Sequence, residues 1–277
     1  VIVASRVHGS AGSVWLAVAL TLLALPMDVQ AETVPYAGSL GVAGLTLSAQ
    51  SASRVDLHFE LGALTLEPVS INGQAYTHLA IPEALLPNDA GAPDLPGVSR
   101  MIAIPRGAVA RLEILNARTE VRSGLRVSPA PVIPRENEDG PLVYAENADL
   151  YSRDAAFPEA PVLLSPPGQL RGVDFVTLGV TPFAYNPVRG ELTVFTELDV
   201  RVHFDGGAGQ FGEERLRSRF WEPILAEHLL NYATLAPVDF SARSALKDQR
   251  DGWEYFIICP DDPAFMAWAD TLKAWRK

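Results

Sequence analysis

The chain has 277 residues, 48% of them hydrophobic and 20% charged, so it can bury a sizeable core and is expected to fold. A net charge of −11 argues against the basic surface that nucleic acids and anionic membranes bind. The single cysteine, Cys259, excludes an internal disulfide and a cysteine-based zinc site. The 22 prolines and 21 glycines favour an all-β fold for most of the chain.

The N-terminus has the features of a signal peptide. A weakly positive start precedes the apolar run Val14–Leu25, which is shorter than the ~20 residues of a membrane-spanning helix. The small residues Val29 and Ala31 predict cleavage between Ala31 and Glu32. We therefore expect residues 1–31 to be removed rather than to anchor the protein. The mature protein is expected to be exported, to the periplasm, the cell surface or the medium, with no stable membrane anchor.

Short strands are expected between residues 40 and 121. Hydrophobic and polar residues alternate in each of them, as in strands that bury one face. Asn72 and Gly73 form the preferred pair for a tight type I′ hairpin turn. The strands that we expect are Val55–Leu61, the two arms of Val69–Leu79, Arg100–Pro105 and Ala110–Ile114. Strands and turns at this spacing predict a sandwich of packed sheets.

A longer strand is expected further along the chain. From Leu192 to Phe204 every second residue is apolar except Thr196, a period that fits a half-buried antiparallel strand and excludes an amphipathic helix. The turn Tyr185–Gly190 precedes this strand. The run Val173–Val180 is rich in β-branched residues and is expected to be its hairpin partner.

Two stretches, Ser128–Gly140 and Asn147–Pro167, interrupt the strands. Prolines and an acidic cluster preclude a central strand in the first, which we expect to be an exposed loop. The acidic run Glu136–Asp139 lacks the alternating ligands and the glycine of a calcium loop, and no histidine pair has metal-ligand spacing. We therefore assign no metal site and no cofactor.

The pattern changes after the long strand. Apolar residues recur at helical spacing from Phe220 to Tyr232, and the polar connector Ala236–Gly252 follows. Tyr255–Cys259 is a continuous apolar run, as in buried parallel strands, and Pro263 begins a helix with one apolar face. These two elements read as the first βα unit of an α/β domain. One such strand cannot form a sheet alone, so the chain looks truncated at the start of a second domain.

The fold class expected is therefore mostly β. Residues 32–208 form an antiparallel β-sandwich-like region, and residues 209–252 form a helix and a connector. Residues 253–277 are the N-terminal fragment of an α/β domain.

Several short motifs, taken in their order along the chain, suggest a family. They are Met101–Pro105 with Gly107, the loop Pro131–Gly140, Arg171-Gly172, Tyr185–Pro187 with the long strand, Leu229–Tyr232, and Tyr255–Ile258 leading to Trp268 and Trp275. This order resembles the pro-region of the gingipain family of secreted cysteine endopeptidases, followed by the start of their catalytic domain. The resemblance covers residues 38–277 and rests on the order of the motifs.

The resemblance implies a prodomain that assists folding and keeps the peptidase inactive until it is cleaved away. The implied partner is the downstream cysteine peptidase domain of the same precursor. The catalytic His and Cys of the family lie beyond position 277, so no catalytic residue is assigned here and this chain alone is expected to be inactive. Cys259 follows an apolar run with no histidine nearby in sequence, and we interpret it as a small hydrophobic residue rather than a nucleophile.

The resemblance also implies an inhibitory arginine. In arginine-specific members a prodomain arginine occupies the specificity pocket, and Arg135 on the proline-stiffened loop matches that position. A guanidinium can pair bidentately with a buried carboxylate, which makes this substrate mimicry chemically sound. The other interpretation of Arg135 is an ordinary solvated arginine in an acidic turn.

Activation requires an accessible cut between the prodomain and the peptidase. The connector carries Arg243, Lys247 and Arg250, and its exposed backbone would favour proteolysis. Arg243 and Arg250 are the candidate processing sites for an arginine-specific cut. Basic residues in a linker can equally serve only solubility.

A second function stays open on the sequence alone. The chain could be an exported β-sandwich module for binding or adhesion, with no protease role. The downstream reading frame would separate the two, because a peptidase precursor must contain a catalytic His and Cys there.

Overall fold

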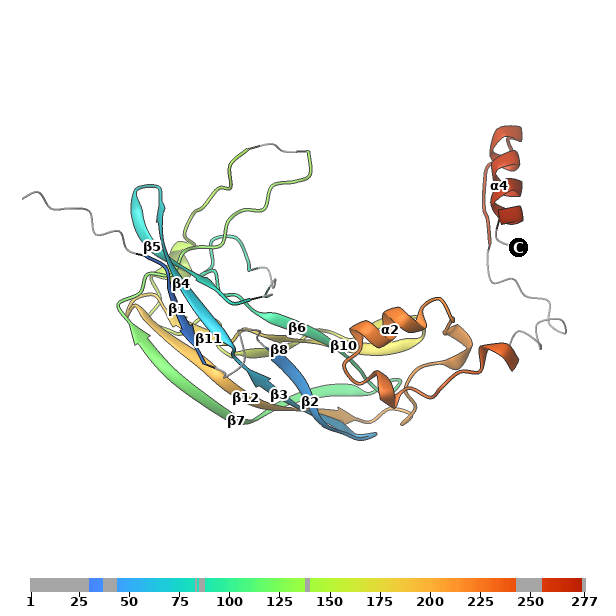
Figure 1. Ribbon diagram of the computed structural model, residues 1–277, viewed down its shortest axis with the longest axis horizontal. Coiled ribbons are helices and arrows are strands. Elements are labelled where there is room, and N and C mark those ends of the chain that lie inside the picture. The colour runs from blue at the N-terminus through green and yellow to red at the C-terminus, as the bar shows by residue number, and fades with distance from the viewer. Residues whose placement is uncertain are drawn as a thin grey trace, which may run out of the picture.

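The structure of the protein, a computed structural model, describes residues 30–36, 44–82, 84, 88–137, 140–242 and 256–275. Two antiparallel sheets pack against each other around one hydrophobic core, and a smaller third sheet continues the core at one end (Figure 1). The predicted mostly β, sandwich-like fold is confirmed.

The largest sheet is built around β12 (Glu191–Asp205), the strand predicted from its alternating pattern. Its neighbours are β7 (Val109–Ser123) along one edge, β11 (Phe183–Asn186) and β3 (Arg54–Glu60) along the other, and β2 (Gly44–Gln50) outside β3. The inner face of β12 is fully buried at Leu192, Val194, Leu198, Val200 and Val202. Alternation thus placed this strand correctly.

The outer face of the same sheet is covered by cross-strand pairs of polar side chains. His58 Nδ1 lies 2.8 Å from Asp199 Oδ1, and His203 Nε2 lies 2.7 Å from Glu113 Oε2. Hydrogen bonds from His58 and Asn116 lower the pKa of Asp199. Both histidines lie on the polar outer face, and their carboxylate partners make them part of the sheet surface.

The second sheet corrects one prediction. Its central strand is β10 (Val173–Val180), which was expected to be the hairpin partner of the long strand. Instead β10 pairs with β6 (Val98–Ala103) on one edge and with β8 (Val162–Leu164) and β9 (Gly168–Leu170) on the other.

The hairpin partner of β12 is the short strand β11. Between β10 and β11 the chain passes from one sheet to the other at Thr181 and Pro182, and proline has no N–H for the ladder. A strand in either sheet would bury every second residue, so the alternating pattern of β10 could not show to which sheet it belongs.

The third sheet contains β1 (Glu32–Pro35), β4 (Ala63–Ile71) and β5 (Gln74–Ala80), in the order β1-β4-β5. Asn72 and Gly73 join β4 to β5 with φ angles of 52° and 77°. Two positive φ angles define the type I′ turn, so the predicted hairpin is confirmed. β1 begins at the residue that the predicted signal cleavage would leave as the N-terminus.

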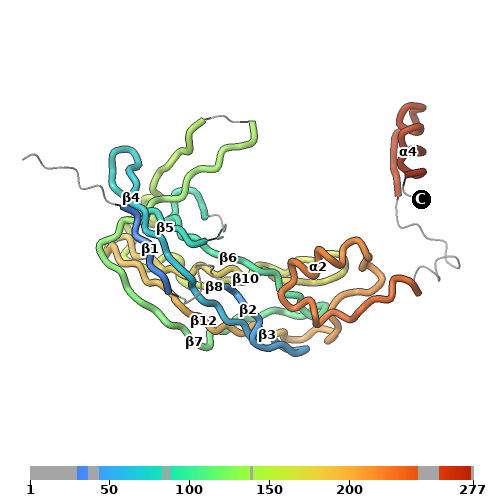
Figure 2. The backbone as a smooth tube through the Cα atoms, viewed as in Figure 1, coloured from blue at the N-terminus to red at the C-terminus, as the bar shows by residue number. Residues whose placement is uncertain are grey.

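Residues 211–236, called the clasp below, pack onto the sandwich after its last strand. The clasp contains the 3₁₀ turns η1 (Glu214–Leu216) and η2 (Tyr232–Thr234) and the helix α2 (Glu222–His228). The core residues that it supplies are Phe211, Leu225, Leu229 and Leu235. Figure 2 shows this segment against the ends of β6 and β10.

The clasp helix is shorter than the predicted Phe220–Tyr232 pattern. It ends at His228 because Leu229 takes an extended conformation and bridges to Met101 of β6. Two residues later, the buried Asn231 side chain accepts a hydrogen bond from the backbone N–H of Ala103 at 2.7 Å and donates one to its carbonyl at 2.8 Å. The clasp therefore extends the edge of the second sheet.

A buried ion pair also fastens the clasp. The Arg217 side chain is only 3% exposed and pairs with Glu222, donating to it through Nε at 2.9 Å. Tyr232 donates a hydrogen bond to the same carboxylate at 2.6 Å. Burial alone would raise the pKa of Glu222, but the hydrogen bonds from Arg217 and Tyr232 bring that pKa below its usual value.

The C-terminal segment contains the helix of the predicted βα unit, and the assignment of that unit to a second domain stays a prediction. The helix is present as α4 (Pro263–Trp275), but the described residues before it, 256–260, form no strand. Phe256 and Ile258 are 76% and 91% exposed. A strand that buries both faces forms only between neighbouring strands, and no described strand pairs with this segment.

Candidate functional site

A loop projects from the end of the sandwich that carries the β4–β5 hairpin (Figure 1). We call residues 131–143 the finger; residues 138 and 139 lie outside the described residues. Its aliphatic side chains are exposed, with Ile133 at 71% and Val143 at 60%, and Val132 and Leu142 at 49% each. The predicted exposed loop, Ser128–Gly140, is confirmed for residues 132–137 and 140, whereas Ser128 and Ala130 are buried. Its apolar surface is a feature that the prediction lacked.

The two stems of the finger meet at Gly91. Gly91 N donates to the Ala130 carbonyl at 2.9 Å, and Asn147 N donates to the Gly91 carbonyl at 2.8 Å. Gly91 has a φ angle of 81°, and a Cβ at this position would lie 2.7 Å from the Ala145 carbonyl oxygen. Only glycine combines this conformation with so close an approach of backbones. Asn147 then caps the short helix α1 (Ala148–Tyr151).

A group of three side chains, called the clamp below, joins both stems to β5. Arg126, on the first stem, donates to Glu146 Oε1 on the second stem through Nη2 at 2.7 Å and Nε at 3.1 Å. Tyr76 of β5 donates to the same oxygen at 2.9 Å, and the Arg126 guanidinium lies 4.7 Å from the centre of the Tyr76 ring. The hydrogen bond that Arg126 donates to Glu146 raises the pKa of Arg126. Burial, and then the hydrogen bond to Glu146, raises the pKa of Tyr76.

Arg135 follows Pro134 on the first side of the finger and is exposed. Arg243 and Arg250 lie outside the described residues. Ala31 and Glu32 are both exposed; Ala31 directly precedes β1, and Glu32 is its first residue. The described candidates belong to two segments far apart in the sequence, the finger and the start of β1. The clamp was missed because its members lie 20 and 70 residues apart, with no spacing signal to connect them.

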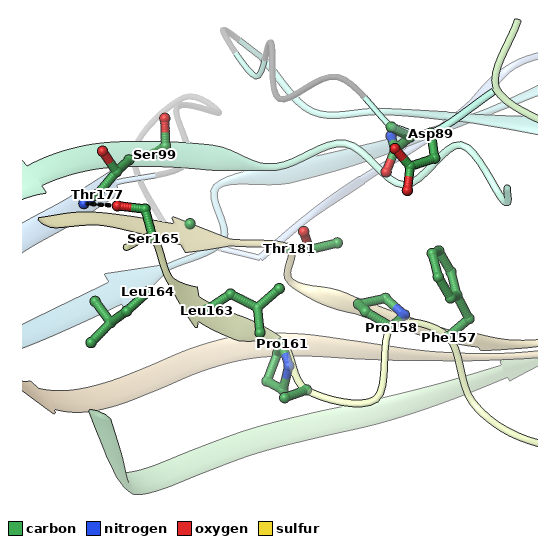
Figure 3. Close-up of a pocket in the computed structure, with 13 residues that line it drawn as sticks. Asp89, Ser99, Phe157, Pro158, Pro161, Leu163, Leu164, Ser165, Thr177 and Thr181 are labelled. Carbon is green, nitrogen blue, oxygen red and sulfur yellow. Dashed lines mark hydrogen bonds between the residues drawn. The ribbon is translucent and has the colours of Figure 1, made fainter. Parts of the chain in front are cut away.

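An open groove of about 430 Å³ crosses the outer side of the second sheet (Figure 3). Its walls include Phe157, Pro158 and Leu163, and Ser165 Oγ accepts a hydrogen bond from the Thr177 backbone N–H at 2.9 Å. Among the described residues that line it, Asp89 is the only ionisable one. General acid–base catalysis needs positioned proton donors and acceptors, so this groove offers no catalytic pair.

Other catalytic arrangements find little support in the described part of the chain. No group of three His, Cys, Asp or Glu side chains there could hold a metal ion. No helix among the described residues has the length and apolar character to cross a membrane. Cys259 is half-buried rather than buried, with its sulfur 3.6 Å from that of Met266. The finger is therefore the candidate functional site.

Comparison with known proteins identifies the family. The sequence model of the family Propeptide_C25 matches residues 37–219, more than half of the chain. The chain belongs to this family. It carries the propeptide of a gingipain-type cysteine peptidase.

The similar curated proteins are gingipains of Porphyromonas gingivalis. Lys-gingipain HG66 is 25% identical over 184 residues, which cover 64% of this chain and 11% of that protein. Gingipain R2 is 32% identical over 126 residues, which cover 44% of this chain and 17% of that protein. The chain thus spans only about a tenth of the length of the Lys-gingipains that it matches.

Two solved structures share the fold. One is the complex of Porphyromonas gingivalis RgpB pro- and mature domains, with a TM-score of 0.59 at 24% identity over 68% of this chain and 97% of that chain. The other concerns zymogenic latency of gingipain K, with a TM-score of 0.53 at 22% identity over 64% and 99%. These results favour the prodomain over the independent binding module. The assignment of residues 253–277 to a peptidase domain lies outside the matched residues and stays a prediction.

Proposed function

We propose that this chain is the N-terminal part of a secreted gingipain-like cysteine endopeptidase precursor. Its β-sandwich assists folding of the peptidase domain of the same precursor and inhibits that domain until proteolysis removes it. The observation that carries this proposal is the finger, an exposed loop with an arginine, held at its base, in a chain of a propeptide family.

The finger suits substrate mimicry in three respects. It presents Arg135 between proline-stiffened backbone and exposed aliphatic side chains, which can dock on a partner surface. Its stems are fixed to the sandwich, which reduces the ordering cost of docking. Of the two arginines near the finger, Arg126 lies at its base and Arg135 lies on the loop itself. Arg135 is therefore the residue that we propose enters the specificity pocket.

Inhibition assays test this role. The chain from Glu32 onward, added to the mature peptidase of the same precursor, is expected to inhibit it. Arg135→Ala should weaken inhibition about a hundredfold, because a buried carboxylate in the pocket would lose its partner. Arg118→Ala is the matched control, since Arg118 is an exposed arginine on the outer face of β7 with Glu197 as its partner.

The outcomes are separable. A wild-type chain that does not inhibit would overturn the prodomain role. Unchanged inhibition by Arg135→Ala would exclude Arg135 as the inhibitory residue and leave the prodomain role intact. An equal loss of inhibition with Arg118→Ala would show that the effect comes from the positive charge of the chain and is not specific to Arg135.

Processing is proposed at two points. Signal peptidase would cut between Ala31 and Glu32, and a protease with arginine specificity would cut after Arg243 or Arg250 in the connector. Mass spectrometry of the secreted products tests both, since the new termini should match these bonds. Termini elsewhere in the connector would leave the inhibitory role intact and reject these two arginines.

A further inference from the structure

We infer that Arg126, Glu146 and Tyr76, the clamp, are positioning residues that set the direction of the finger and thereby the strength of inhibition. The inference rests on the proposed function of the finger. It adds that affinity depends on side chains at the base of the finger as well as on Arg135.

The geometry supports this role because Glu146 joins three separate segments. One of its oxygens accepts hydrogen bonds from Arg126 on the first stem and from Tyr76 on β5, while Glu146 itself belongs to the second stem. The fork of an arginine restricts the angle between the two groups that it joins. The clamp therefore fixes the two stems relative to each other and to the sheet.

The finger has little other support above its base. In its described part, one backbone hydrogen bond joins the two sides, from Val132 N to the Val143 carbonyl at 2.8 Å. Its aliphatic side chains are exposed and pack into no core. The direction in which Arg135 is presented thus depends on how the stems leave the sandwich.

When a loop samples several directions, its affinity is reduced to the fraction of time that it spends in the competent one. Loss of the clamp should therefore reduce affinity mainly through presentation, with the fold of the sandwich unchanged. The Arg126 and Glu146 side chains are 48% and 25% exposed, so solvent can satisfy either group when its partner is removed.

The first test compares Glu146→Ala with Asp154→Ala. Asp154 is a matched control, because it also accepts two hydrogen bonds from one arginine, Arg189 Nε at 2.7 Å and Nη2 at 3.3 Å, in the turn before β12 and not between the two stems of the finger. With the chain from Glu32 onward and the mature peptidase, Glu146→Ala should raise the inhibition constant about tenfold. Asp154→Ala should stay within about twofold of wild type.

Hydrogen exchange distinguishes positioning from general destabilisation. In Glu146→Ala the amides of Val132 and Asn147 should lose protection, while those of β12 should not. Protection lost equally across the sandwich would contradict the inference, because the clamp would then support the whole fold.

A double-mutant cycle tests whether the clamp acts through Arg135. In an Arg135→Ala background, Glu146→Ala should change the inhibition constant less than about twofold. A full tenfold loss in that background would overturn the inference. Should Glu146→Ala fail to fold, Tyr76→Phe removes only the hydroxyl, which contacts Glu146 and Gln74, and should weaken inhibition about threefold with the melting temperature unchanged.

Failure of the inference differs from failure of the proposed function. If the wild-type chain does not inhibit, the prodomain role itself falls. If wild type inhibits and both Glu146→Ala and Tyr76→Phe inhibit equally well, the clamp has no positioning role and the prodomain role stands.

Discussion

The finger and the clasp lie at opposite ends of the long axis of the sandwich (Figure 1) and use their apolar residues in opposite ways. The clasp buries Leu225 and Leu229 in the common core and closes around an ion pair that solvent barely reaches. The finger leaves Ile133 and Val143 exposed and is held by a partly exposed ion pair at its base. The clasp thus completes the fold, whereas the finger leaves its aliphatic side chains exposed.

The largest expected effect is loss of the buried pair in the clasp. Arg217→Met leaves the Glu222 carboxylate without its guanidinium partner in a buried site and should lower the free energy of unfolding by about 3 kcal/mol or more. Urea denaturation measures this. Arg111→Met, at an exposed pair with Asp205, is the control and should cost less than about 1 kcal/mol. Equal losses would mean that the clasp is no more tightly joined than the surface.

Removal of the side chain that extends β6 should have the next largest effect. Asn231→Ala leaves the buried N–H and carbonyl of Ala103 without partners and should destabilise the protein by about 2 kcal/mol. Asn116→Ala on the exposed outer face serves as the control in the same denaturation assay. A loss below about 0.5 kcal/mol for Asn231→Ala would show that water replaces these bonds.

Acid should weaken the clasp through Glu222. Its folded pKa is lowered, so its ionised form contributes stability that is present above the unfolded pKa of about 4.3 and is lost as the pH falls through the folded pKa. The stability difference between wild type and Glu222→Gln should therefore shrink below about pH 4. Denaturation curves from pH 7 to pH 3 measure the difference, and a constant value would contradict the prediction.

The smallest effect on stability is expected in the finger. Ile133→Ser removes an aliphatic side chain from the surface and should change the free energy of unfolding by less than about 0.5 kcal/mol. The same change should weaken inhibition of the mature peptidase severalfold, because the exposed side chain would be buried on docking. A large loss of stability would place Ile133 in the fold rather than in the interface.

Much of this architecture could be predicted from local patterns. Three features were predicted from residues that are close together in the sequence: the strand β12, the Asn72-Gly73 turn and the exposed, proline-containing finger. β10 was assigned to the wrong sheet because the alternation of apolar and polar residues shows which face of a strand is buried, but not which of two facing sheets the strand joins. The clamp could not be foreseen, since Tyr76 and Glu146 meet only after distant strands have paired.

The start of β1 lies at the predicted signal cleavage bond. Glu32–Pro35 pairs with Ala63–Leu66 of β4 from its first residue, so no spacer separates the predicted signal cleavage bond from the sheet. A protease needs extended, accessible backbone around the bond that it cuts. If cleavage occurs between Ala31 and Glu32, it must precede the pairing of β1 with β4. The outer edge of β4 would then stay unpaired until the signal peptide has been removed.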